Sequence, residues 1–384
     1  MEEVRLGTLT NRKIGYGIVQ PGASVPHGIP VIKVNNIISG LRNVRDLDTT
    51  SIGNDKKYSR TKLKGGELIV SVVGTIGRTA IVPLNFAGCN LVRATALIDI
   101  PDVQMSKWVK YYIDSPKGQN YIRKKLNTTV QPTLNVKSLV EMPIPVYSTQ
   151  YMQKAIEILG NIDDKIEINR RINDNLEQQA QALFKSWFVD FEPFRDQPFV
   201  ESELGMIPER WKVGTLGEIM NITSGKRPPK KETKPIEDFI VPLIGASGIM
   251  GYTNSVLFNE KILVIGRVGT HGVVQRFNTP CWPSDNTLVI KSCFYEYCYQ
   301  ILCSIDYTSL NRGSTQPLIT QTDIKNQLIV IPPIEVINNF EVIVSTLMNL
   351  EIINVEESRR LAELRDTLLP RLMSGEIKVG DVTL

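Results

Sequence analysis

Apolar residues spaced three and four apart run through two long stretches of the chain. The first covers about residues 148–190 and the second about residues 333–376. This spacing is typical of helices that bury one stripe, and roughly 40 residues give about 60 Å of helix. Helices of this length favour a coiled coil. The residues expected to pair the helices or dock a partner are Leu159, Ile162, Ile166, Leu176, Leu183, Leu347, Leu350, Leu361, Leu364 and Leu368.

The segments before the two long stretches show short β-branched runs between glycine, proline and asparagine. Leu68–Val73 is such a run, and Lys261–Ile265 is its counterpart later in the chain. Runs of this kind predict strands. We therefore expect an α+β protein with two β-rich globular modules and two long helices. The predicted parts are residues 1–147 (first module), 148–190 (central helix), 191–210 (polar linker), 211–332 (second module), 333–376 (distal helix) and 377–384 (tail).

The chain repeats itself. The two long stretches align without a gap, so that Asn169 falls on Asn354. Upstream, the string Gly-Thr-Ile-Gly at 74–77 is echoed by Gly-Thr-His-Gly at 269–272. The helices keep their register between copies, whereas the loops differ. The repeat therefore predicts a target with two unlike halves, where a homodimer would bind a palindrome.

Each long helix is too apolar along one stripe to stand alone in water. The two most simply bury those stripes on each other, and either direction is topologically possible. We predict the antiparallel pairing, with an internal pseudo-twofold repeat, because the segment at 191–210 lets the chain turn at the helix end. Asn169 and Asn173 on the predicted seam would then penalise wrong registers.

Charge and composition narrow the function further. The net charge is only +4 over 384 residues, but basic residues gather in loop-like segments at 56–64, 123–125 and 226–234. Such clusters are most often solvated faces, yet their recurrence in both modules favours phosphate contacts. No apolar run reaches the roughly 18–20 residues of a membrane span. Five irregularly placed cysteines predict free thiols, and we expect a cytoplasmic protein with no membrane partner.

Motifs for catalysis are weak. His27 and His271 are the two histidines, and neither belongs to a nucleophile or metal-ligand spacing. Cys293, Cys298 and Cys303 lie five apart, which is not a zinc pattern. The sequence predicts no catalytic residue, no metal ligand and no cofactor in this chain.

Four strings carry a family resemblance. Gly205–Trp211 reads G-x-I-P-x-x-W, Phe184–Phe191 and Leu368–Ile377 end the two long stretches, and Gly-Ser-Thr-Gln-Pro stands at 313–317. Together with their order, they resemble the specificity (S) subunit of type I restriction–modification systems over essentially the full length. One departure is Thr128, which stands where the glycine of that last string would fall in the first copy.

The resemblance implies a non-catalytic, sequence-specific DNA-binding subunit. Two target-recognition domains, held apart by an antiparallel helical spacer, would each recognise one half of a bipartite, asymmetric double-stranded DNA site. The helices would set the gap and dock two methyltransferase (M) subunits, and restriction/translocase (R) subunits could join. S-adenosylmethionine would belong to the methyltransferase. A coiled-coil adaptor without a DNA function is the alternative, and an enzyme is the third possibility.

Base edges and phosphates call for different side chains at the loop tips of the modules. Arginine and asparagine suit guanine and adenine edges, whereas lysine suits phosphate. The glycines at 74, 77, 269 and 272 would allow close backbone approach, or simply form tight turns. The candidate DNA-binding residues are Lys57, Tyr58, Arg60, Arg78 and Asn127 in the first module, and Lys226, Arg227, Lys230, Arg267, His271 and Arg312 in the second.

Overall fold

The computed structural model divides the chain into two compact units. One unit is Met1–Ile168 together with Glu357–Leu384, and the other is Asn169–Glu356. Each unit therefore contains one β-rich module and one half of each long helix, and each is described by itself. The structure describes residues 2–127, 132–269, 272–310 and 318–377.

The two long helices are present at the predicted places. They are α6 (Thr149–Phe188) and α9 (Ile334–Met373), within three residues of the predicted bounds. In the first unit the Tyr151 hydroxyl donates to the carbonyl oxygen of Leu372 at 2.8 Å. Further along, Lys165 lies 3.3 Å from Glu357. Residue numbers rise along α6 as they fall along α9, so the helices are antiparallel in this unit.

The same direction holds in the second unit. Asn173 donates through Nδ2 to the carbonyl oxygen of Glu351 at 3.4 Å, and Asn354 donates to Oδ1 of Asn173 at 2.8 Å. Beyond them, the rings of Phe184 and Phe340 lie 6.1 Å apart. The predicted antiparallel pairing is thus confirmed. The asparagine bonds also agree with the prediction that polar seam positions define the register.

The residues predicted to pair the helices or dock a partner fall on both buried and exposed positions. Leu350 and Leu364 are 48% and 42% exposed, so they lie off the buried stripe, and docking a partner stays the prediction for them. The buried stripe of α9 runs instead through Val344 and Met348, because the helix turns every 3.6 residues and the true stripe leaves the assumed heptad. Leu159, Ile162 and Leu176 are buried, and Ile166, Leu183, Leu347, Leu361 and Leu368 are half-buried.

The first module contains two small sheets. One is antiparallel with the order β2-β8-β5-β6, and the other has the order β4-β3-β7 with β3 and β7 parallel. A further pair, β1-β11, joins the two ends of the module. The strands are β1 (Glu2–Arg5), β2 (Gly15–Tyr16), β3 (Ile29–Ile32), β4 (Thr49–Thr50), β5 (Leu68–Ser71), β6 (Thr79–Ile81), β7 (Asn90–Leu91), β8 (Thr95–Ile98), β9 (Leu126–Asn127), β10 (Thr133–Leu134) and β11 (Pro143–Val146).

The second module repeats this plan. Its sheets have the orders β15-β21-β18-β19 and β17-β16-β20, and β14-β22 joins its ends. The repeat seen in the sequence is therefore a repeat of topology. The strands are β12 (Phe199–Ser202), β13 (Gly205–Pro208), β14 (Lys212–Thr215), β15 (Asn221–Ser224), β16 (Val241–Gly245), β17 (Gly248–Thr253), β18 (Ile262–Gly266), β19 (Val274–Phe277), β20 (Trp282–Pro283), β21 (Thr287–Lys291) and β22 (Leu328–Ile331).

The shorter helices differ between the modules. In the first, α3 and α4 follow each other and are separated by Ser115, whose hydroxyl caps α4. In the second module, the described residues between α7 and α8 form no counterpart of α4, and residues 311–317 of that segment lie outside the described part of the chain. The helices are α1 (Val34–Ser39), α2 (Ile52–Lys57), α3 (Val103–Asp114), α4 (Pro116–Lys124), α5 (Val136–Val140), α7 (Tyr295–Ser304) and α8 (Gln321–Lys325).

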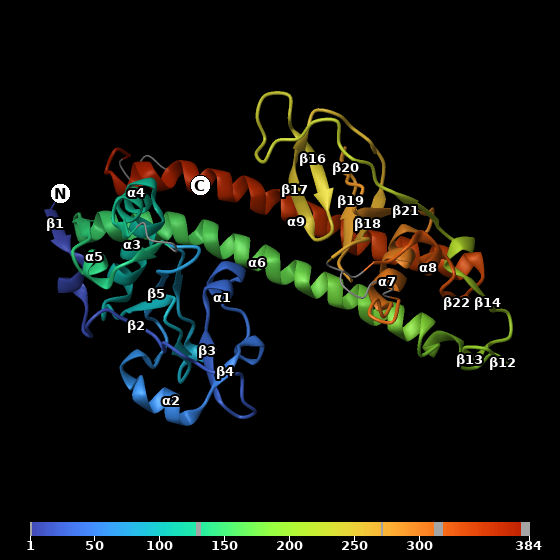
Figure 1. Cartoon of the computed structure of the whole chain (residues 1–384), viewed down its shortest axis with the longest axis horizontal. Coiled ribbons are helices and arrows are strands. Elements are labelled where there is room, and N and C mark those ends of the chain that lie inside the picture. The colour runs from blue at the N-terminus through green and yellow to red at the C-terminus, as the bar shows by residue number, and fades with distance from the viewer. Residues whose placement is uncertain (1, 128–131, 270–271, 311–317, 378–384) are drawn as a thin grey trace. The chain divides into compact units, whose positions relative to one another are not determined.

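One core joins the first module to the long helices. Trp108 of α3 is fully buried, and its indole donates to the carbonyl oxygen of Pro145 at 2.7 Å. The same apolar cluster includes Leu159 of α6 and Leu372 of α9. Figure 1 shows α3, α4 and α5 beside the start of α6, whereas α2 lies at the far end of the module. Helix α3 is therefore the element through which the module is fixed to the long helices.

Two sequence expectations need correction here. The segment predicted as a linker folds into the hairpin β12-β13, and Phe194 just before it packs edge-on against Trp211 at 5.0 Å. One window of α9 also has a mean hydropathy of 1.3, long and apolar enough by composition to span a membrane. One such helix is weak evidence for a membrane span, because the test considers length and composition only, and 22% of the window is buried.

Candidate nucleic-acid interface

The loop between β5 and β6 is the best-defined candidate loop. Gly74 and Gly77 both have positive φ, at 77° and 84°, which glycine adopts without strain. The Ser71 hydroxyl closes the loop, since it donates to the carbonyl oxygen of Thr75 at 2.5 Å and accepts from the backbone N–H of Arg78 at 2.8 Å. The loop is thus a tight turn that presents an exposed Arg78.

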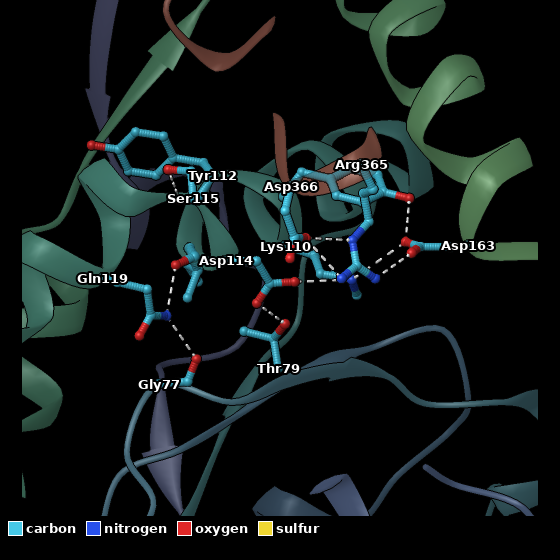
Figure 2. Close-up of polar contacts among 12 residues, drawn as sticks. Gly77, Thr79, Lys110, Tyr112, Asp114, Ser115, Gln119, Asp163, Arg365 and Asp366 are labelled. Atoms are coloured by element: carbon cyan, nitrogen blue, oxygen red, sulfur yellow. Dashed lines mark hydrogen bonds and ion pairs between the residues drawn. The ribbon is translucent and has the colours of Figure 1, made fainter. Parts of the chain in front are cut away.

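Side chains from α3 and α4 hold this loop in place (Figure 2). Gln119 donates through Nε2 to the carbonyl oxygen of Gly77 at 2.9 Å and to that of Ile113 at 2.8 Å. The Thr79 hydroxyl donates to Oδ1 of Asp114 at 2.6 Å. Any side chain at position 77 would also collide with Gln119, because a Cβ there would lie 2.8 Å from its Oε1.

The polar contacts continue from α3 to both long helices. Lys110 pairs with Asp114 at 3.0 Å and lies 4.0 Å from Asp163 of α6. The Tyr111 hydroxyl donates to Asp163 at 2.9 Å, and Arg365 of α9 pairs with the other carboxylate oxygen at 2.9 Å. Burial, followed by the Asp163 charge, raises the pKa of Tyr111, so its hydroxyl stays a donor. Figure 2 shows Asp163 facing Arg365.

These groups enclose a cleft of about 810 Å³ in the first unit. Four cationic side chains and three carboxylates line it. Lys110 and Arg365 are already paired with aspartates, as described above. Its charged and polar lining residues are Thr75, Arg78, Thr79, Lys110, Asp114, Gln119, Arg123, Asp163, Arg365 and Asp366.

The second unit fixes its module to the long helices through Arg276 of β19. Its guanidinium lies 3.1 Å from Glu177 of α6, 2.6 Å from Glu351 of α9 and 3.6 Å from Glu296 of α7. It also stacks on the Tyr299 ring at 4.3 Å. Burial raises the pKa of Glu296 to about 7, although Arg276 acts in the opposite direction. One arginine is therefore shared by carboxylates from three helices.

The structure does not gather the first module's candidate residues in one place. Lys57 ends α2, and Tyr58 and Arg60 follow it, with the Tyr58 side chain half-buried. Asn127 is exposed on β9. Only Arg78 lines the cleft. The cleft-lining residues and the α2 group are therefore distinct surfaces of the module, and the DNA-contacting role of each remains a prediction.

Three candidates of the second module share one loop. Lys226, Arg227 and Lys230 lie between β15 and β16 and are exposed. The loop is anchored where the Trp282 indole donates to the carbonyl oxygen of Lys226 at 2.7 Å. Arg267 directly follows β18 and is half-buried. His271 and Arg312 lie outside the residues that the structure describes.

Several cleft residues were not among the predicted site residues. Arg123 belongs to the basic segment at 123–125, so charge clustering had marked its surroundings. Lys110 and Gln119 stand on helices with no local pattern that distinguishes them from solvent-facing residues. Among the described residues, no group of three or more His, Cys, Asp or Glu side chains is placed to hold a metal ion.

Comparison with known proteins identifies the family. Residues 2–178 and 208–365 both match the model of the type I restriction modification DNA specificity domain. The chain belongs to this family. The two matches fall one in each half, in agreement with the repeat. Membership bears out the expected role in DNA specificity, and nothing supports the adaptor alternative.

Individual relatives are also specificity subunits of type I restriction enzymes. The chain is 28% identical over 308 residues to the type I restriction enzyme MjaIX specificity subunit of Methanocaldococcus jannaschii, covering 73% of this chain and 71% of that one. It is 26% identical over 331 residues to the HindI specificity subunit of Haemophilus influenzae, covering 65% and 72%. The crystal structure of a type I system S subunit from M. genitalium matches with a TM-score of 0.51 at 18% identity, covering 97% and 95%. That likeness shows the fold.

Proposed function

We propose that this chain is the DNA-recognition subunit of a type I restriction–modification complex in which each module recognises one half of a bipartite, asymmetric site. The observation that carries the proposal is a repeated topology with unlike loops. Both modules have the same strand orders, yet Arg78 after Gly77 corresponds to Val273 after Gly272. Similar frameworks with different loop chemistry suit a target with two different halves.

The long helices dock the methyltransferase subunits in this proposal. Helix α9 keeps large apolar side chains in solvent: Val342, Ile343, Leu350 and Ile353 are between 43% and 69% exposed. Exposed apolar groups concentrated on one element favour a protein partner. Because the repeat provides the long helix twice, we expect two methyltransferase subunits, with restriction subunits able to join.

The chain itself carries no catalysis in this proposal. Methylation, with its S-adenosylmethionine, and cleavage belong to the partner subunits, and the complex is cytoplasmic. Methylation or cleavage by the purified chain alone would contradict this division of labour.

Methylation mapping in a host with and without this chain tests the proposal. Adenines methylated only in its presence should define one split, asymmetric sequence. The Arg227→Ala variant, assembled with methyltransferase, should then bind a duplex with the second module's half-site intact at least about 5-fold more weakly than the wild type does. On a duplex in which that half-site is altered, the variant and the wild type should bind equally. Arg195→Ala is the control, because Arg195 is exposed and pairs with Glu192 outside either module's loops. Equal loss at both halves would contradict separate recognition, and no binding to any duplex would restore the adaptor alternative.

A further inference from the structure

Two cations in the first module's cleft have no anionic partner. Arg78 from the β5–β6 loop and Arg123 near the end of α4 both line the cleft and are exposed. Within the described part of the chain, neither forms an ion pair, whereas Lys110 and Arg365 do. The cations of this cleft without an ion pair are therefore two arginines from different elements, and the four cations and three carboxylates give the cleft a net charge of +1.

Their position in a recess determines what they can reach. A side chain that contacts base edges has to project into a groove that is about 8.5 Å deep in B-form DNA. Residues in the cleft are flanked on one side by the module and on the other by Asp163 and Arg365 of the long helices. Only a group that protrudes from the duplex can enter such a recess, and that group is the phosphate backbone.

The carboxylates of the cleft point to the same ligand. Asp114 already accepts from Thr79 and Lys110, Asp163 from Tyr111 and Arg365, and Asp366 from Arg365. All three carboxylates are therefore already engaged by groups of the chain. The open hydrogen-bonding capacity belongs to guanidinium groups, which match phosphate oxygens.

We propose that Arg78 and Arg123 clamp the backbone phosphates of double-stranded DNA, and that Gln119 positions the Arg78 loop for this contact. The proposal rests on the proposed DNA-recognition function and deepens it. It assigns Arg78 to affinity and register and not to sequence discrimination. Gln119 does not touch DNA; it fixes the carbonyl oxygen of Gly77 next to Arg78.

Among the described residues, the clamp is present in the first module only. Val273 takes the place of Arg78 in the second copy, and it is 38% exposed. The described part of that module also lacks a helix corresponding to α4, which carries Arg123 and Gln119. The two modules thus hold DNA in different ways, although their sheets are equivalent.

Salt dependence of binding tests the clamp. The full chain assembled with methyltransferase is titrated with a duplex carrying the mapped target, between about 50 and 200 mM salt. Arg78→Ala and Arg123→Ala should each reduce the slope of log affinity against log salt by about 1, and lower affinity about 8-fold near 0.1 M salt. Arg78→Lys should keep the slope, because lysine retains the charge. Arg5→Ala, an exposed arginine on β1 that does not line the cleft, should change nothing.

Discrimination between the target and singly substituted duplexes separates backbone from base contact. The clamp predicts unchanged discrimination for Arg78→Lys, whereas loss of preference at one base pair would overturn it. Unchanged slopes in both alanine variants would also overturn it. Gln119→Ala should reduce the slope as Arg78→Ala does while leaving the melting temperature of the complex within a few degrees. A wild-type complex without sequence preference would contradict the proposed function. Comparison of the salt slopes of the wild type and the alanine variants on a duplex of random sequence would still test the clamp in that case.

Discussion

The two modules are fixed to the long helices around central groups of opposite charge. In the first unit the central group is the carboxylate of Asp163 on α6, which accepts from the module's Tyr111 and also pairs with Arg365 of α9. In the second unit the cation Arg276 belongs to the module's sheet, and the long helices supply the carboxylates Glu177 and Glu351. One topology can therefore be anchored by unlike chemistry at equivalent interfaces.

The two anchors also differ in redundancy. Asp163 and Arg365 each have a second partner, Tyr111 and Asp366 respectively. Among the described residues, Glu177, Glu351 and Glu296 form no ion pair other than that with Arg276, and Glu296 is 5% exposed. Removal of one partner from a buried ion pair leaves uncompensated charge, which is the costly case. The second anchor should therefore be the more fragile.

The largest expected effect is for Arg276→Met. The variant retains much of the side chain's apolar stem but leaves Glu177, Glu351 and Glu296 without their ion-pair partner. It should lower the free energy of unfolding by about 3–5 kcal/mol. Hydrogen exchange of β18, β19 and α7 should accelerate strongly, while that of α3 should not. Arg276→Lys is the matched control and should recover part of the protection. Equal acceleration in both modules would show that the anchors are not independent.

Glu296→Gln should raise the free energy of unfolding, and the size of this gain should depend on pH. Because burial raises the pKa of Glu296 to about 7, folding is penalised once pH exceeds the usual carboxyl pKa of about 4.5. The contribution of protonated Glu296 to the free energy of unfolding is fully present below about pH 4.5 and is lost as the pH rises through about 7. The gain of the variant over wild type should grow from below about 1 kcal/mol at pH 5 to at most about 3 kcal/mol at pH 8. Urea unfolding at both pH values measures this gain, and a pH-independent difference would contradict the assignment.

Asp163→Ala should have the smallest effect of the three. The carboxylate is partly exposed, and its loss removes one hydrogen bond from Tyr111 and one ion pair with Arg365, which keeps Asp366. We expect the free energy of opening of α3, measured by hydrogen exchange, to fall by about 2 kcal/mol. Asp163→Asn keeps an acceptor for Tyr111 and should cost less. A loss as large as that of Arg276→Met would remove the contrast between the anchors.

Much of the fold followed from the sequence because it depends on local periodicity. The three-and-four spacing located α6 and α9, and β-branched runs between turn residues located β5 and β18. The exact buried stripe of α9 did not follow. A heptad and a 3.6-residue repeat diverge over 40 residues, so Leu350 and Leu364 lie off the buried stripe.

The candidate site was less predictable. The Gly-Thr-Ile-Gly string marked the β5–β6 loop, and the basic segment at 123–125 marked the end of α4, but nothing in the sequence joined them. Gln119 connects the two only because α4 folds back beside the loop.

The sequence by itself determined the repeat, the helix lengths and the family, since these depend on spacing and order along the chain. Only the tertiary structure decided which charges are paired. Asp163 meets Arg365 across 202 positions, and Arg276 meets Glu177 across 99. Ion pairing depends on distance in space, and two cations with similar surroundings in sequence can be neutralised or free. Arg365 is paired and Arg78 is not, and this difference gives the cleft its affinity for phosphate in our proposal.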